Sequence, residues 1–104
     1  MVYTPTVVEI VQSATFAKWL AKLNDSRARA RIQVRIDRLA LGNAGDVKPV
    51  GRGVSEMRID YGPGYRIYFL QRGPIIVVLL CGGTKRTQQT DIRRAIEIAN
   101  DWRE

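Results

Sequence analysis

The stretch GVSEMRIDYGPGYRIYF, residues 53–69, decides the fold class of this chain. Apolar and polar residues alternate through residues 55–61 and again through residues 65–71, which is the period of a β-strand. The Gly-Pro-Gly between these runs is typical of a turn, because glycine accepts a positive φ and proline fixes its own. The stretch therefore predicts an antiparallel β-hairpin.

The alternation also predicts the register of the hairpin. We expect Tyr61 to pair with Tyr65 across a three-residue loop, which sets Asp60 opposite Arg66. A shift by one residue would mix polar and apolar side chains on both faces. One face then packs on the core, and the other carries the polar residues Glu56, Arg58, Asp60, Arg66 and Tyr68.

This polar face has two interpretations. The simpler one is a solvated sheet face, with Asp60 paired to Arg66 and Arg58 stacked on Tyr68. The functional one is a phosphate site, because each guanidinium group can donate two hydrogen bonds to one oxyanion.

The residues around the hairpin predict a single α+β domain over residues 1–104. An apolar stripe at helical spacing, from Phe16 to Leu23, indicates a first helix, and a second stripe from Ala28 to Leu39 indicates a helix that ends before Gly42. Strands are expected at 7–11, 47–50, 55–61, 65–71 and 75–81, and helices after Ser13, over 27–41, and after Thr87 or Thr90. The last strand is apolar on both faces and is expected to lie centrally, ending at Gly82-Gly83. The order is β-α-α-β-β-β-β-α.

The composition excludes several kinds of site and catalytic group. The chain has 104 residues, no His and one Cys, so it has no disulfide framework, no Cys/His metal site and no His-dependent catalytic group. Cys81 ends an apolar run and is expected to be buried and unreactive. The longest apolar run is far shorter than the roughly 20 residues of a membrane span, and no signal-peptide pattern opens the chain. We expect a reducing cytoplasm, no membrane, no metal and no cofactor.

The composition has an excess of positive charge. Seventeen Lys and Arg against ten Asp and Glu give a net charge of +7, which favours an anionic partner such as nucleic acid. Residues 82–88, GGTKRTQ, combine glycines, two cations and a helix start, and so predict either an anion site or an ordinary basic turn. The arginines Arg27, Arg31, Arg35 and Arg38 form one stripe on the second helix. The stripe is either a solvated face or a surface for RNA phosphates or an acidic partner segment.

Residues 53–69, together with LLCGGTKRTQQTDI at residues 79–92, closely resemble the HigB-like, phage Gp49-related branch of the RelE/ParE toxin superfamily. These proteins are the toxins of bacterial type II toxin–antitoxin modules. The resemblance covers nearly the whole chain, including FAKWL at 16–20 and GDVKPV at 45–50. It implies a RelE-like fold, with a small curved antiparallel sheet packed on helices, and a cognate antitoxin protein as partner.

The resemblance further implies an mRNA interferase that cuts translating mRNA in the ribosomal A site. Such enzymes use the 2′-hydroxyl of the RNA to attack the adjacent phosphate without a metal ion. The reaction needs a base, an acid and cations around the phosphorane. By position, Arg58 and Arg66 would stabilise the phosphate, and Glu56 is the nearest candidate base. Lys85 or Arg86 would protonate the leaving oxygen or hold the phosphate.

The remaining roles and alternatives follow from the same resemblance. Tyr68 would stack on an RNA base or orient the phosphate. Some relatives use a histidine that this chain lacks, so the identities of base and acid stay open. A ParE-like protein that inhibits DNA gyrase by binding is one alternative, and an inactive relative that binds RNA or its antitoxin is another. The clustered cations at residues 58, 66, 85 and 86 favour the nuclease.

Overall fold

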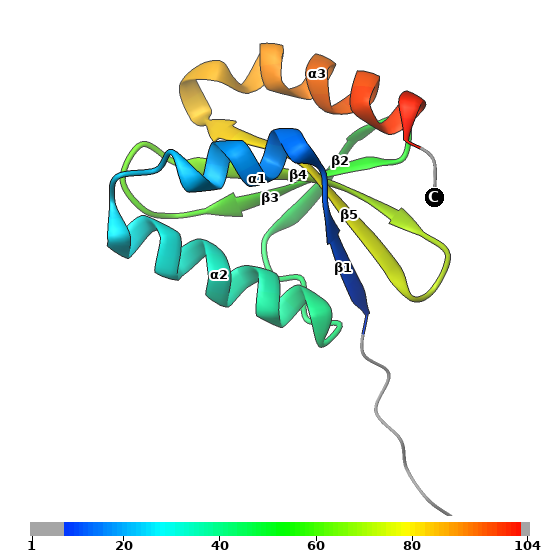
Figure 1. Ribbon diagram of the computed structural model, residues 1–104, viewed down its shortest axis with the longest axis horizontal. Coiled ribbons are helices and arrows are strands. Elements are labelled where there is room, and N and C mark those ends of the chain that lie inside the picture. The colour runs from blue at the N-terminus through cyan, green and yellow to red at the C-terminus, as the bar shows by residue number, and fades with distance from the viewer. Residues whose placement is uncertain (1–7, 103–104) are drawn as a thin grey trace, which may run out of the picture.

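The structure, a computed structural model, describes residues 8–102 and has the predicted α+β order. Helices lie on both sides of a central sheet, and a 3₁₀ turn at Lys85–Thr87 leads into the last helix (Figure 1). The strands are β1 Glu9–Gln12, β2 Val47–Gly51, β3 Val54–Ile59, β4 Tyr65–Arg72 and β5 Ile76–Thr84, and the helices are α1 Ala14–Ala21, α2 Ser26–Ala40 and α3 Gln88–Asp101. Within residues 8–102, no helix is long and apolar enough to cross a membrane.

The sheet has five strands in the order β1-β5-β4-β3-β2. Three of the four strand pairs are antiparallel, and β1 pairs with β5 in parallel. The predicted central place of β5 is confirmed, since β1 and β4 flank it, and β2 lies at one edge of the sheet. An edge tolerates Pro49, which cannot donate a ladder hydrogen bond. The predicted start of the first strand at Val7 lies outside the described residues.

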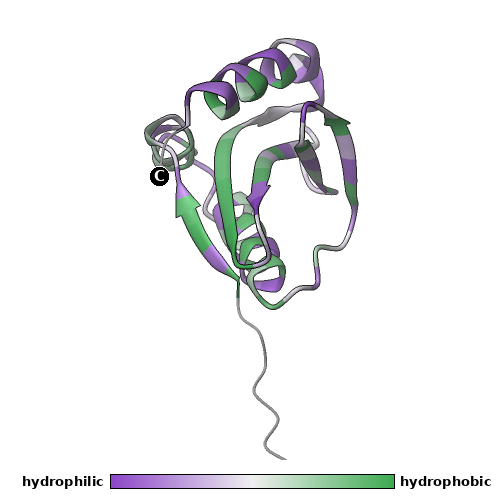
Figure 2. Cartoon of the chain, turned by 90° about the vertical axis from the view of Figure 1, so that its right-hand side faces the viewer, coloured by the Kyte–Doolittle hydropathy of each residue, from purple (hydrophilic) through white to green (hydrophobic). Residues whose placement is uncertain are grey.

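Each face of the sheet has its own apolar core, because β5 buries side chains on both sides. One core lies against α1 and α2 and includes Phe16, Ala28, Ile32, Ile36, Leu39, Met57, Ile67 and Leu79. The other lies against α3 and includes Val54, Tyr68, Val78, Leu80, Cys81, Ala95 and Ala99. Figure 2 shows the hydrophobic strands between helices that carry both hydrophilic and hydrophobic residues. The four predicted core positions of α2 are all buried.

Local hydrogen bonds explain where the helices begin and end. The Ser13 side chain accepts the N–H of Phe16 and donates its own hydroxyl hydrogen to the Leu80 carbonyl, which ties the start of α1 to β5. At the end of α2, Gly42 has a φ of 84° and donates to the Leu39 carbonyl. This positive φ is the conformation that makes glycine favourable directly after a helix. Both caps were predicted from the sequence.

The predicted register of the hairpin is wrong by two residues. Ile59, not Tyr61, pairs with Tyr65, so Arg58 lies opposite Arg66 across the two strands. Tyr61 lies outside the strand, and its hydroxyl donates to Asp25 at the start of α2, over 3.0 Å. The faces are still the predicted ones, because a shift of two residues conserves side-chain alternation. The expected pairs, Asp60 with Arg66 and Arg58 with Tyr68, do not form.

The prediction that Gly82-Gly83 ends the last strand is also wrong. β5 continues to Thr84, and Gly82 and Gly83 pair with β4. A Cβ at Gly82 would overlap the indole of Trp19, and a Cβ at Gly83 would overlap the carboxylate of Asp91. These glycines therefore permit α1 and α3 to approach the strand closely, which is a packing role.

Candidate phosphate site

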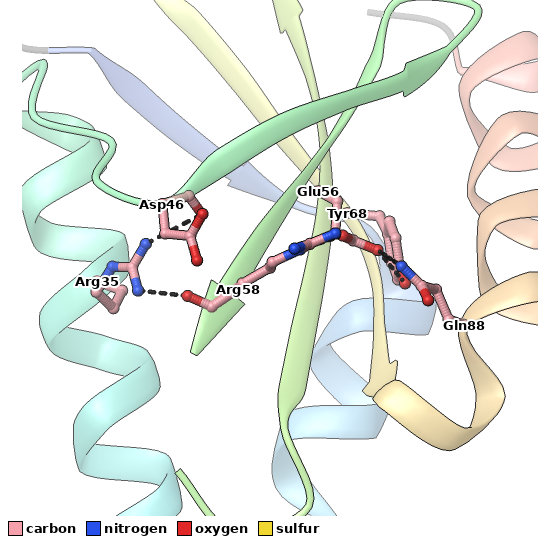
Figure 3. A network of polar contacts seen from close by, with 6 residues as sticks. All are labelled: Arg35, Asp46, Glu56, Arg58, Tyr68 and Gln88. Carbon is pink, nitrogen blue, oxygen red and sulfur yellow. Dashed lines mark hydrogen bonds and ion pairs between the residues drawn. The ribbon is translucent and has the colours of Figure 1, made fainter. Parts of the chain in front are cut away.

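A buried carboxylate is the centre of the polar face of the hairpin. Glu56 has an exposed fraction of 0% and accepts three hydrogen bonds. Its Oε1 accepts from Arg58 Nε at 2.9 Å, and its Oε2 accepts from the Tyr68 hydroxyl at 3.0 Å and from Gln88 Nε2 at 2.7 Å (Figure 3). The donors come from β3, β4 and the first residue of α3. The network thus connects the hairpin to α3.

The network keeps Glu56 ionised. Burial by itself would raise the pKa of this carboxyl, but the hydrogen bonds from Arg58, Gln88 and Tyr68 together hold its pKa below the usual value. The bond to Glu56 in turn raises the pKa of Arg58. Burial and the neighbouring Glu56 charge raise the pKa of Tyr68, so its hydroxyl stays a donor. The network therefore holds one ionised carboxylate, and three neighbouring side chains donate hydrogen bonds to it.

Arg66 adds a second cation to the same face without adding an anion. It lies opposite Arg58 on one side and Gly83 on the other. Its Nε is the one buried side-chain nitrogen or oxygen without a hydrogen-bond partner among the described residues. The two arginines are in register on neighbouring strands, and the carboxylate of Glu56 binds Arg58. Arg58 and Arg66 together carry more positive charge than Glu56 neutralises, and Arg66 Nε has no acceptor. These are the features of an anion site.

Arg35 fixes the backbone of this face from the other side of the sheet. Its guanidinium donates to the carbonyl of Arg58 at 2.5 Å and to the carbonyl of Ala44 at 3.1 Å. A third, longer bond reaches the carbonyl of Asp46, which also accepts the N–H of Arg58 (Figure 3). Arg35 is half-buried. This member of the predicted RNA-binding stripe is therefore a clamp between α2 and β3.

The other stripe residues are more accessible. Arg31 lies over the ring of Tyr61, with its guanidinium carbon 4.7 Å from the ring centroid. Arg27 and Arg38 are exposed. The four arginines therefore do not form one continuous exposed surface, because Arg35 binds the backbone of β3.

Lys85 and Arg86 lie in the 3₁₀ turn that follows β5, and both are exposed. The N–H of Lys85 donates to the carbonyl of Gly64 at 2.8 Å, which holds the turn against the hairpin loop. The N–H of Thr84 donates to the hydroxyl of Thr87. These backbone donors are occupied, so the segment supplies two cationic side chains rather than the open backbone cradle that its glycines predicted.

Two further predictions concern buried groups. The ring of Tyr68 has an exposed fraction of 0%, so in this structure it has no surface on which an RNA base could stack. Cys81 is buried as predicted, and burial followed by the charge of Asp91 raises its pKa to about 12. Such a thiol is unreactive at neutral pH. Among residues 8–102, no group of three or more His, Cys, Asp or Glu side chains could hold a metal ion.

Sequence reasoning missed Gln88 as a site residue, and it missed the contact of Arg35 with β3. Gln88 donates to Glu56 across 32 positions of sequence, and Arg35 bonds to the backbone of Arg58 across 23. An amide at the first residue of a helix and an arginine in a basic stripe are common on protein surfaces, so the sequence carries no signal for either contact.

Comparison with known proteins places this chain in a family. Residues 18–104 match the family described as phage derived protein Gp49-like (DUF891). An uncharacterized protein of Haemophilus influenzae is 47% identical over 94 residues, which cover 90% of this chain and 95% of that protein. The chain therefore belongs to the phage Gp49-like family.

Proposed function

We propose that this protein is the toxin of a bacterial type II toxin–antitoxin module, an mRNA interferase that cleaves translating mRNA at the ribosome in the cytoplasm. The observation that supports this most is that Arg66 lies opposite Arg58 across the two strands, with its Nε buried and without a hydrogen-bond partner. An RNA phosphodiester would supply the missing anion. Membership of the Gp49-like family, whose sequence pattern resembles the HigB-like branch of RelE/ParE toxins, supports the same function.

In this proposal the RNA provides the nucleophile. The 2′-hydroxyl loses its proton to solvent and its oxygen attacks the adjacent phosphorus, a 2′,3′-cyclic phosphate forms, and the bond to the 5′-oxygen breaks, so the second product carries a 5′-hydroxyl. Arg58 and Arg66 stabilise the charge that develops on the phosphorane oxygens. Lys85 or Arg86, exposed beside the hairpin loop, holds the phosphate or protonates the leaving 5′-oxygen.

Glu56 fits a positioning role better than that of general base. Both of its oxygens already accept hydrogen bonds, and its side chain has no exposed surface. The hydrogen bonds that lower its pKa also reduce its basicity. We therefore propose that Glu56 orients the guanidinium of Arg58 toward the substrate.

Cleavage during translation tests the proposal. We expect the purified protein, added to translating ribosomes, to produce discrete mRNA cuts by primer extension, with 2′,3′-cyclic phosphate ends. Because the chain has no His and a single buried Cys, pretreatment with EDTA and removal of the chelator should leave the rate unchanged. Activity lost after EDTA and restored by one divalent ion would contradict the mechanism. Inhibition of DNA gyrase supercoiling without mRNA cuts would replace the proposed function with gyrase inhibition.

The proposal includes an antitoxin, and a groove on α2 offers it a surface. The groove has a volume of about 480 Å³, and its walls include Arg31, Arg38, Val34 and Ile59. Val34 is 47% exposed, so apolar area lies between two cations. An acidic, amphipathic antitoxin segment would match this pattern.

Charge reversal at Arg31 and Arg38 should slow association with the cognate antitoxin about tenfold at low salt, with a smaller effect at high salt. Arg35 is left unchanged because it holds the β3 backbone. Stopped-flow association rates measure the effect, and Arg93→Glu on exposed α3 is the matched control. Equal rates at low salt for the double variant and the wild type would show that α2 carries only a solvated face.

A further inference from the structure

We propose that a second pocket, at the free edge of β5, binds a nucleotide of the single-stranded RNA next to the cleaved bond. The pocket has a volume of about 300 Å³ between α1 and α3, and its walls include Thr15, Lys18, Trp19, Lys22 and Arg94. This volume is at the lower end of the roughly 300–1,000 Å³ of small-ligand pockets. The inference rests on the proposed function, because the pocket would bind the part of the RNA substrate that lies beyond the cleaved bond.

The charge of the pocket suits a phosphate backbone. Lys18 lies on α1, Lys22 follows the end of α1 one turn later, and Arg94 reaches the pocket from α3. All three are exposed, and none makes a hydrogen bond or ion pair to another side chain in the part of the chain that the structure describes. The carboxylate at the pocket belongs to Asp91, which accepts a hydrogen bond from Thr87. Three free cations against one carboxylate leave a net positive charge for RNA phosphates to neutralise.

An indole ring gives the pocket a platform for a base. Trp19 packs on Gly82, where any side chain would overlap the ring. The rings of Phe16 and Tyr65 pack against the same indole, with ring centroids 5.7 Å and 6.2 Å away. Trp19 is only partly buried and lines the pocket. A fixed aromatic ring next to cations is the combination that binds single-stranded nucleic acid with little sequence preference.

The place of the pocket in the fold connects it to the candidate phosphate site. β1 ends opposite Leu79, whereas β5 continues to Thr84, so β1 does not pair with the last part of β5 and the pocket lies there. On the opposite side of that segment, Gly83 pairs with Arg66. Neighbouring strands are about 5 Å apart, so the two sites are separated by little more than one strand. RNA bound at Arg66 can therefore reach the pocket by crossing the end of β5.

Trp19 fluorescence tests this inference directly. The chain has two tryptophans, so Trp102→Phe leaves Trp19 as the single reporter. The probe is a single-stranded RNA pentanucleotide with 2′-O-methyl riboses, which cannot be cleaved by 2′-hydroxyl attack. We expect it to quench Trp19, and we expect Lys18→Ala with Lys22→Ala to weaken binding about tenfold. The slope of log affinity against log salt should become shallower by about 0.7 for each RNA phosphate that a lysine no longer neutralises.

The matched control is Lys48→Ala, which removes an exposed lysine from β2 at the other edge of the sheet. Anisotropy of a labelled pentanucleotide on protein with both tryptophans gives the same affinities if Trp102→Phe does not fold. Equal losses for Lys48→Ala and for the α1 lysine variants would overturn the inference. RNA binding without a change in Trp19 would overturn it too, as would quenching by a poly-glutamate peptide but not by RNA.

The binding assay separates this inference from the proposed function. Quenching of Trp19 by RNA, in a protein that never cuts mRNA, would refute the proposed nuclease and support the pocket. Cleavage of mRNA that is indifferent to Lys18→Ala, Lys22→Ala and Arg94→Ala would support the nuclease and refute the pocket.

Discussion

Arg66→Met is expected to abolish most mRNA cleavage while leaving the protein at least as stable as the wild type. Removing one preorganised donor to a developing oxyanion costs about 10²–10³-fold in rate. Methionine keeps much of the length of the side chain but removes the charge and the buried, unpartnered Nε. It also removes the repulsion from Arg58 across the two strands, and like charges in that position destabilise a sheet by up to about 1 kcal/mol. A loss of activity with no loss of stability is the signature of a functional residue.

The measurement combines single-turnover cleavage with thermal unfolding. Arg93→Met, on the exposed face of α3, is the matched control and should change neither quantity. Arg58→Lys gives a second comparison, because it keeps the charge but replaces the planar fork that binds Glu56. We expect this variant to lose activity and some stability together. Full cleavage by Arg66→Met would refute the assignment of the phosphate site.

The hairpin could be predicted from sequence because its information is local. Alternation with period two fixes which side chains share a face, and that result survived a register shift of two residues. The register itself leaves Tyr61 outside the strand, where it contacts residues that are distant in sequence. Its partners, Asp25 and Arg31, lie 36 and 30 positions earlier in the chain, and no turn rule includes them.

The burial of the polar face could not be predicted from the sequence. The sequence places Glu56 and Tyr68 on one face with two arginines, and a solvated face satisfies that pattern. In the structure α3 packs over this face, so Glu56 and Tyr68 have no exposed surface. The close approach depends on Gly83, which gives Asp91 of α3 room against β5. The same glycine pattern fits an anion site or an ordinary basic turn equally well, because small residues serve each purpose.

Glu56→Ala is expected to lower the free energy of unfolding by about 3–5 kcal/mol, which is large against the roughly 5–15 kcal/mol of a typical domain. The change removes the acceptor of three donors, and one of them, the Tyr68 hydroxyl, is fully buried. A buried donor left without a partner loses its hydration with no compensation. Urea unfolding at neutral pH measures the loss, with Glu97→Ala on exposed α3 as the control.

The same carboxylate should make the protein acid-sensitive. Its pKa is lower in the folded state than in the unfolded state, so the unfolded chain binds more protons as the pH falls below the usual carboxyl range, about pH 4.3. The contribution of Glu56 is therefore complete above that range and is lost as the pH falls toward its folded pKa. Between about pH 5 and pH 3, Glu56→Gln should lose less stability than the wild type, because its amide does not titrate in that range. Identical pH profiles for the two proteins would mean that Glu56 is not held as a buried carboxylate.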